Sequence, residues 1–211
     1  MGRIIAIISA SVIAAAVILS LTVFKEKIKS AFYIGHMESD NRIRQMNIDR
    51  IMDRLNIRRG DRVADIGAGS GLFSRKLSSL VSSGGKVYSV DINKELLMHI
   101  DEVNEKENIK NIQTVLAGED DPGIPGPVDL VFICDTFHYM DNQERYIGKL
   151  VDYLDKNGRI AIVSFIRTWP PMSNKFTDKD LTAWMEKAGM QLAGYHDDII
   201  QDQYLAIYRK K

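Results

Sequence analysis

Hydrophobic and polar positions divide the chain into an apolar start and an alternating remainder. Residues 4–24 carry no charged side chain. About 21 helical residues at ~1.5 Å each extend roughly 31 Å, close to the hydrocarbon thickness of a bilayer. The pattern predicts a transmembrane anchor over residues 1–24 and a juxtamembrane connector over residues 25–37. A cleaved signal peptide and a buried soluble helix are the alternatives; no small-residue cleavage site follows the apolar run, which disfavours the signal.

Positive charges on either side of the predicted span bear on its orientation. Arg3 precedes the span, whereas Lys25, Lys27 and Lys29 follow it. Cytoplasmic flanks carry an excess of Lys and Arg, so the carboxyl-terminal side is expected to face the cytoplasm. The sequence therefore predicts a single-pass membrane protein whose remaining domain, residues 38–211, is cytoplasmic.

Beyond the connector, the spacing of apolar residues predicts a doubly wound α/β domain. Residues 38–57 place apolar side chains at helical spacing, and strands then alternate with helices from residue 62 onward. The last two strands are joined without a helix, which predicts a hairpin and an antiparallel edge strand on an otherwise parallel sheet. The expected strands are 62–66, 86–90, 112–116, 128–133, 159–165, 191–197 and 203–208, and the expected helices are 71–82, 93–107, 142–154 and 177–187.

Composition narrows the possible functions. Lys plus Arg and Asp plus Glu both number 28, so the formal net charge is zero, which disfavours a general nucleic-acid binder. Cys134 is the only cysteine, which excludes an intramolecular disulfide and a cysteine-built zinc site. No cluster of metal-ligand residues is evident in the sequence, and no metal is expected.

The stretch VADIGAGSG, residues 63–71, is the strongest chemical signal. Glycines at alternate positions follow a predicted strand, and they let a ligand approach the main chain closely. The helix expected after Gly71 points its amide groups toward a negative ligand group. Leu72 stands where the dinucleotide pattern G-x-G-x-x-G requires its third glycine, which disfavours a nucleotide-dependent oxidoreductase. Asp91 ends the second strand about 20 residues on, where a carboxylate can accept both ribose hydroxyls.

Four stretches together resemble a known family. VADIGAGSG, VYSVDI, VDLVFICDTFHYM and LDKNGRIAIVSF resemble the successive motifs of class I S-adenosylmethionine-dependent methyltransferases. The small bacterial and archaeal members that act on quinones, lipids and other small molecules are the most similar. The resemblance covers residues 40–209 and implies S-adenosyl-L-methionine as the cofactor and a mostly parallel, seven-stranded Rossmann-like sheet with a carboxyl-terminal antiparallel hairpin.

The resemblance also assigns roles by position. It places the methionine and ribose end of the cofactor at the first glycine loop, the ribose hydroxyls at the end of the second strand, and the adenine after the third. Asp121 is an alternative to Asp120 at the adenine amino group, or a residue of the turn before Pro122. The assigned residues are Asp65, Gly67, Ala68, Gly69 and Gly71 for the first region, Asp91 and Ile92 for the second, and Glu119 and Asp120 for the third.

Catalytic candidates follow the central strand. Asp135 is expected to face the methionine amino group or the acceptor. His138 is the candidate general base, because its pKa range suits proton transfer near neutral pH. Substrate contact without proton transfer, or a packing role, are the alternatives for His138. Tyr139 and His36 are weaker candidates, and Cys134 is expected to be a buried strand residue.

Missing motifs exclude one acceptor class and leave others open. Nucleic-acid amino-methylating enzymes of this class carry an Asn/Asp-Pro-Pro-aromatic box after the fourth strand, and residues 135–138 lack it. Trp169 follows the fifth strand and is expected to shape a loop over the acceptor pocket. The sequence predicts a membrane-anchored methyltransferase for a small or lipid-soluble acceptor. A non-catalytic cofactor-binding module and a protein acceptor are the alternatives.

Overall fold

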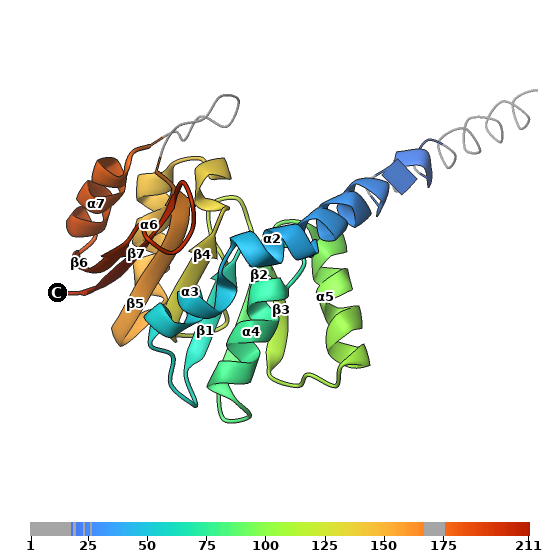
Figure 1. Ribbon diagram of the computed structural model, residues 1–211, viewed down its shortest axis with the longest axis horizontal. Coiled ribbons are helices and arrows are strands. Elements are labelled where there is room, and N and C mark those ends of the chain that lie inside the picture. Colours follow the sequence, from blue (N-terminus) through green and yellow to red (C-terminus); the bar gives the residue numbers. More distant parts are fainter. Residues whose placement is uncertain (1–17, 19, 23, 26, 167–175) are drawn as a thin grey trace, which may run out of the picture.

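The computed structural model describes residues 18, 20–22, 24–25, 27–166 and 176–211. Most of the predicted span, and the loop that contains Trp169, lie outside these residues, so the anchor and the loop's role stay predictions. Among the described residues, no helix is long and apolar enough to cross a membrane. Residues 27–37 are helical, so the predicted connector is a helix, and it projects away from the domain (Figure 1).

Seven strands form one sheet in the order β3-β2-β1-β4-β5-β7-β6 (Figure 1). The apolar strand β4 lies in the middle and is buried along nearly its whole length, as its sequence predicts. All pairs among the first five strands are parallel. The strands are β1 (Arg62–Ile66), β2 (Lys86–Asp91), β3 (Ile112–Leu116), β4 (Val128–Cys134), β5 (Leu154–Phe165), β6 (Met190–His196) and β7 (Gln203–Lys210).

The carboxyl-terminal hairpin is present, but its antiparallel strand does not lie at the edge. β7 pairs antiparallel with both β5 and β6, which places it inside the sheet and leaves β6 outermost. The burial of the two strands agrees with this order, because seven of the eight β7 side chains are fully or partly buried, whereas β6 exposes three of its seven residues. An edge strand tolerates such exposure better than an interior one.

Helices cover both faces of the sheet, which confirms the doubly wound α/β class. α3, α4 and α5 pack on one face through Ile51, Leu77 and Ile100. α6 and α7 pack on the other through Ile147 and Leu181. The helices are α2 (Asp40–Gln45), α3 (Ile48–Leu55), α4 (Leu72–Val81), α5 (Lys94–Lys106), α6 (Gln143–Asp152) and α7 (Asp178–Lys187), with a short 3-10 helix η1 (Phe137–Tyr139) after β4.

Helix ends follow the local sequence where a capping residue is present. The Asn93 side chain accepts hydrogen bonds from the amides of Glu95 and Leu96, as expected for the residue that begins α5. Thr177 and Asp180 form a reciprocal capping box at the start of α7. Gly189 follows α7 with a φ of +81°, a conformation that glycine adopts without strain.

Two local predictions were wrong. The single amphipathic helix expected over residues 38–57 is two helices, because Asn47 adopts a φ of 45° between α2 and α3. No glycine or proline marks this break; asparagine tolerates the left-handed region better than most residues. The strand expected over residues 159–165 is longer, because β5 begins at Leu154, beside a register irregularity between Val128 and Leu130 in β4.

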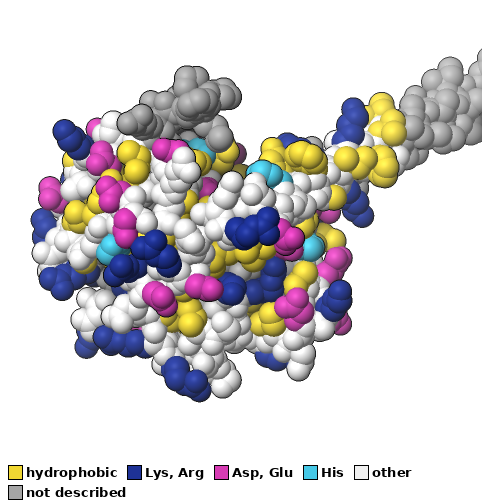
Figure 2. Space-filling model, viewed as in Figure 1, with side chains coloured by type: hydrophobic (Ala, Val, Ile, Leu, Met, Phe, Trp, Pro, Cys, Tyr) yellow, Lys and Arg dark blue, Asp and Glu magenta, His cyan; other side chains and the backbone are white. Residues whose placement is uncertain are grey.

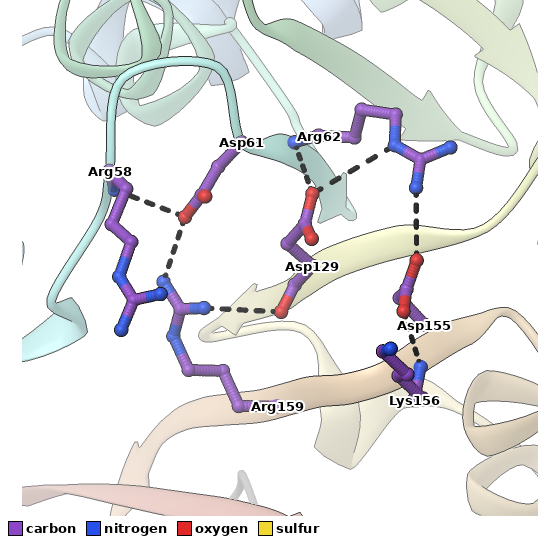
Figure 3. Close-up of polar contacts among 7 residues, drawn as sticks. All are labelled: Arg58, Asp61, Arg62, Asp129, Asp155, Lys156 and Arg159. Carbon is purple, nitrogen blue, oxygen red and sulfur yellow. Dashed lines mark hydrogen bonds and ion pairs between the residues drawn. The ribbon is translucent and has the colours of Figure 1, made fainter.

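A polar network joins the amino ends of β1, β4 and β5 (Figure 3). Arg159 of β5 forms an ion pair with Asp61 at 3.2 Å and donates hydrogen bonds to the carbonyl oxygens of Leu55, Asn56 and Asp129. These carbonyls include the last ones of α3, which otherwise lack helical partners. The network therefore fastens α3 to the end of the sheet opposite the glycine loop.

Candidate active site

The glycine loop and the end of β4 meet where the order of strands reverses. β1 lies between β2 and β4, so the chain leaves β1 and β4 in opposite directions, and ligands bind at such a point in open α/β sheets. A small cavity of about 80 Å³ lies there, lined by the loop at residues 67–70, by residues 134–136, and by Met37 and Arg42. A broader surface hollow of about 620 Å³ borders α6 and α7 and includes none of these loop residues.

Two glycines of the loop have close neighbours. A Cβ atom on Gly67 would lie 2.2 Å from the side chain of Thr136, so the loop after β1 packs against the end of β4 only with glycine there. A Cβ atom on Gly69 would lie 2.7 Å from the sulfur of Met37. Both residues have positive φ, and Ala68 between them lines the same cavity. Gly71 begins α4 rather than lining the cavity.

Asp65 is the buried carboxylate at the end of β1. It is 2% exposed, and its Oδ2 accepts a 2.6 Å hydrogen bond from Ser74 Oγ, which itself accepts one from Ser89 Oγ. Burial raises the pKa of Asp65 to about 7, and the nearby Asp91 carboxylate adds to the rise. Any positive charge that enters the cavity therefore stabilises the ionised form of Asp65.

Asp91 folds the glycine loop against the end of β2. Its Oδ2 accepts a hydrogen bond from the Gly69 amide at 3.0 Å, and its Oδ1 accepts one from the Asn93 amide at 2.9 Å. Burial raises the pKa of Asp91. Each oxygen has a further lone pair, so Asp91 can still accept hydrogen bonds from ribose hydroxyls, as predicted from the sequence. Ile92, beside it, is 70% exposed and offers an apolar surface next to the carboxylate.

The acidic residues after β3 divide into two kinds. Glu119 and Asp120 are exposed, and Asp120 forms only a long ion pair with Arg145 at 3.8 Å. Asp121 accepts hydrogen bonds from the Tyr153 hydroxyl at 2.7 Å and from the Gly123 amide at 2.8 Å. The structure thus gives Asp121 the turn role, and Asp120 stays the predicted adenine contact.

Asp135 ends β4 in a left-handed conformation with a φ of 52°. Its Oδ2 accepts a hydrogen bond from Arg42 at 3.0 Å, and its Oδ1 accepts one from Gln203 Nε2 at 2.6 Å. Burial raises the pKa of Asp135, and the Arg42 guanidinium opposes that rise. Non-glycine residues held in this backbone region cluster at functional sites. Neither Arg42 nor Gln203 was recognised from the sequence.

His138 lies in η1, directly beyond Asp135, between two aromatic side chains. Its ring centroid is 4.1 Å from that of Tyr139 and 5.9 Å from that of Phe165. It is 6% exposed, and neither ring nitrogen has a hydrogen-bond partner among the described residues. Burial lowers the pKa of His138, which favours the neutral, proton-accepting form. Cys134 is buried as expected, and burial raises its pKa, so it is not a thiolate nucleophile.

The segment before α2 covers the glycine loop. The Met37 side chain lies against Gly69, and Glu38 forms a 2.6 Å ion pair with Arg75 of α4. With the bond from Arg42 to Asp135, three contacts hold this segment over the cavity. His36 is exposed.

The surface of the domain shows no single dominant charge on the face drawn in Figure 2. Basic and acidic side chains are interspersed over the domain, whereas hydrophobic and basic side chains lie side by side on the projecting helix (Figure 2). The described part of that helix exposes Phe24, Ile28 and Phe32.

The residues around the cavity fit S-adenosylmethionine. The cradle formed by Gly67 and Gly69 leaves room for a ligand close to the main chain, and Asp65 provides a buried negative charge for the methionine ammonium. Asp91 provides hydrogen-bond acceptors for the ribose. A cavity of about 80 Å³ is smaller than usual ligand pockets, which begin near ~300 Å³, so we expect lining side chains such as Met37 to move when the cofactor binds.

Comparison with known proteins gives the same result. A family described as "Methyltransferase domain" matches residues 57–210. The ubiquinone/menaquinone biosynthesis C-methyltransferase UbiE of Ectopseudomonas mendocina is 28% identical over 192 residues, covering 86% of this chain and 73% of that protein. The match to protein-L-isoaspartate O-methyltransferase of Aeropyrum pernix is 36% identical over 78 residues, covering 37% of this chain and 30% of that protein. This chain spans only 46% to 53% of the length of three other UbiE relatives.

The fold has solved counterparts. The crystal structure of a SAM-dependent methyltransferase from Aquifex aeolicus superposes with a TM-score of 0.73 at 22% identity, covering 83% of this chain and 95% of that one. The family match extends over most of the chain and includes the glycine loop, Asp91 and Asp135. This chain therefore belongs to the methyltransferase domain family and is a class I S-adenosylmethionine-dependent methyltransferase.

Proposed function

We propose that the protein methylates a lipid-soluble acceptor with a flat aromatic ring, of the quinone class, at the cytoplasmic surface of a membrane. The observation that carries this proposal is the aromatic setting of His138, which is flanked by Tyr139 and Phe165 and lies two residues beyond Thr136 of the cavity lining. Aromatic side chains stack well on flat rings. The relatives named for ubiquinone and menaquinone biosynthesis support the same acceptor class.

The chemistry requires alignment more than covalent participation by the protein. S-adenosylmethionine, when bound, supplies the methyl group of its sulfonium to the nucleophilic atom of the acceptor. The chain contributes by orienting the acceptor and by excluding water from the crevice. The acceptor atom must also lose a proton. His138, held neutral by burial, takes that proton on a ring nitrogen.

The apolar amino-terminal segment would place this chemistry beside its substrate. Residues 4–24 are uncharged, and the helix that follows carries Lys25, Lys27 and Lys29. These lysines favour a cytoplasmic position for the domain, where S-adenosylmethionine is made. A tether of this kind keeps the crevice near membrane-dissolved molecules and raises their effective concentration.

A protein acceptor is the alternative. It is favoured by the short match to protein-L-isoaspartate O-methyltransferase, which covers only part of either chain. A non-catalytic cofactor-binding module would keep the same loop and Asp91 but would release no S-adenosylhomocysteine. Turnover separates the module from the enzyme, and the chemical nature of the labelled product separates the two acceptor classes.

The decisive experiment uses S-adenosylmethionine labelled in its methyl group. The full-length protein is incubated separately with a lipid extract of host membranes, with soluble metabolites, and with soluble host proteins. The expected result is label in an organic-soluble aromatic product from the membrane extract alone. Label confined to protein would instead support the alternative acceptor, and label confined to water-soluble metabolites would refute the lipid-soluble class.

A further inference from the structure

Gln203 is the first residue of β7, and only the nitrogen of its side-chain amide forms a hydrogen bond to another described residue. Its Nε2 donates a 2.6 Å hydrogen bond to Asp135 Oδ1. Its Oε1 is buried and has no hydrogen-bond partner within the described part of the chain. The residue as a whole is 4% exposed, so bulk water does not satisfy this oxygen. An unpaired buried acceptor costs free energy, and such groups in a native fold call for an explanation.

The orientation of this amide follows from its neighbours. Arg42 forms a 3.0 Å ion pair with the other oxygen of Asp135 and thereby favours the ionised carboxylate. An ionised carboxylate only accepts hydrogen bonds, so the Gln203 nitrogen must face it. The reverse orientation would bring two acceptor oxygens together. Gln203 therefore presents a carbonyl oxygen, and not an N–H group, on the side away from Asp135.

That oxygen belongs to the same edge of the sheet as His138. Phe165 and Gln203 are directly paired in the antiparallel ladder between β5 and β7, so their side chains lie on one face. The ring of His138 contacts Phe165 at a centroid distance of 5.9 Å, and both of its nitrogens are also buried without partners among the residues described. Gln203 and His138 are thus both neighbours of Phe165, and together they carry three buried polar atoms without a hydrogen-bond partner among the described residues.

We propose that Gln203 is a specificity-determining residue that recognises a hydroxyl group of the acceptor through Oε1. A carbonyl oxygen accepts a hydrogen bond from a hydroxyl but repels an ether or carbonyl oxygen placed at the same point. Gln203 therefore selects rings that carry a free hydroxyl over the same rings with that oxygen methylated. This inference rests on the proposed function for the acceptor class, whereas the geometry of Gln203 and Asp135 stands without it.

The test compares a dihydroxynaphthalene, kept reduced under nitrogen, with its dimethyl ether. Binding to the full-length protein is measured by calorimetry with S-adenosylhomocysteine present, so that no turnover occurs. The native protein is expected to bind the diol about tenfold or more tightly than the ether, as for one hydrogen bond to a buried acceptor. Gln203→Met keeps the length of the side chain but removes the amide, and should reduce that ratio to about threefold or less.

Controls separate recognition from folding. Gln113→Met makes the same chemical change at an exposed position of β3 and should leave the ratio unchanged. The affinity of each variant for S-adenosylhomocysteine, measured alone, should stay within about twofold of native, which a merely misfolded protein would not show. If Gln203→Met does not fold, Gln203→Asn serves instead, because its shorter side chain withdraws the oxygen while keeping an amide.

Three results would overturn or redirect the inference. Equal binding of diol and ether by the native protein, or an unchanged ratio in the Gln203 variants, refutes the role of Oε1. Binding of neither compound refutes the quinone-type acceptor and not the residue. In that case methyl transfer to the active fraction of the host extract is measured with the native protein and Gln203→Met. A KM for that fraction that does not rise in the variant then refutes the proposal.

Discussion

Asp65 makes the stability of this protein depend on pH in an unusual direction. Burial at the end of β1 raises its pKa from 3.8 to about 7, with the Asp91 carboxylate adding to the rise and Ser74 opposing it. In the unfolded chain the same carboxyl group titrates near ~3.9. Between these two values the native state holds a proton that the unfolded state has lost, so the free energy of unfolding falls as pH rises.

The size of this effect follows from the separation of the two pKa values. A difference of about 3 pH units at ~1.36 kcal/mol per unit corresponds to about 4 kcal/mol. The stabilisation is fully present below about pH 4 and is lost by about pH 7. Asp65→Asn removes this dependence, because asparagine cannot ionise but keeps an oxygen that accepts the hydrogen bond from Ser74. The variant should match the native protein near pH 4 and exceed it at pH 8.

Urea unfolding at a series of pH values measures the effect directly. The native protein and Asp65→Asn are compared at each pH, so that all other titrating groups cancel in the difference. The difference in free energy of unfolding should grow between about pH 4 and pH 7 and then level off. Parallel curves for the two proteins would show that the Asp65 carboxyl group titrates normally, which would refute the reasoning from burial.

The same carboxyl group should couple cofactor binding to proton release. A methionine ammonium beside Asp65 favours its ionised form, so binding near pH 7 expels the proton. Calorimetric titration with S-adenosylhomocysteine, which carries the same ammonium, should give a binding enthalpy that varies with the ionisation enthalpy of the buffer. Asp65→Asn should abolish that variation. An unchanged dependence in the variant would mean that another group releases the proton.

Further changes test other parts of the site and the fold. Asp91→Ala should weaken binding of S-adenosylhomocysteine about tenfold, or ~1.4 kcal/mol, and unchanged affinity in calorimetry would reject the ribose contact. Met37→Ala should tighten the same binding about fivefold, because displacing the half-buried methionine side chain costs ~1 kcal/mol in the native protein. Weaker binding would show instead that Met37 contacts the ligand. His138→Ala should slow methyl transfer about 100-fold without changing cofactor affinity. In the native protein, the rate should rise with pH and reach half its maximum below the ordinary pKa of histidine. Equal rates in the variant and the native protein would show that His138 is not the base. Arg159→Met should lower the free energy of unfolding by about 3 kcal/mol in urea while leaving cofactor affinity unchanged, since the network in Figure 3 lies at the other end of the strands.

The arrangement of the candidate cofactor residues could be predicted because it follows from local rules. Strands that end in Asp65, Asp91 and Asp135 are parallel neighbours, so their carboxyl ends meet at one edge of the sheet. Positions of these residues relative to their strands can be read from hydrophobic spacing alone. The glycine spacing predicts the cofactor loop, and the capping chemistry of Asn93 and Thr177 correctly predicted two helix starts.

Features that depend on packing between distant segments could not be predicted. The position of β7 inside the sheet follows from its greater burial relative to β6, yet both strands show similar alternation in sequence. The break at Asn47 lacks the glycine or proline that would mark it. Met37 gave no signal in the sequence, because a methionine in a predicted connector is indistinguishable from one in any amphipathic helix.

Asp135 shows most clearly how the two kinds of information combine. Its position after the central strand made it a candidate, but its partners are Arg42, 93 residues earlier, and Gln203, 68 residues later. Its left-handed backbone is sparsely populated for residues other than glycine, and the two hydrogen bonds offset that cost. One carboxylate therefore ties α2 to the strand that carries Gln203. Met37 lies five residues before Arg42, so we expect a movement of this segment that opens the cavity to strain the ion pair between Arg42 and Asp135 as well. In that case the proposed steps of cofactor entry and acceptor recognition would share Asp135.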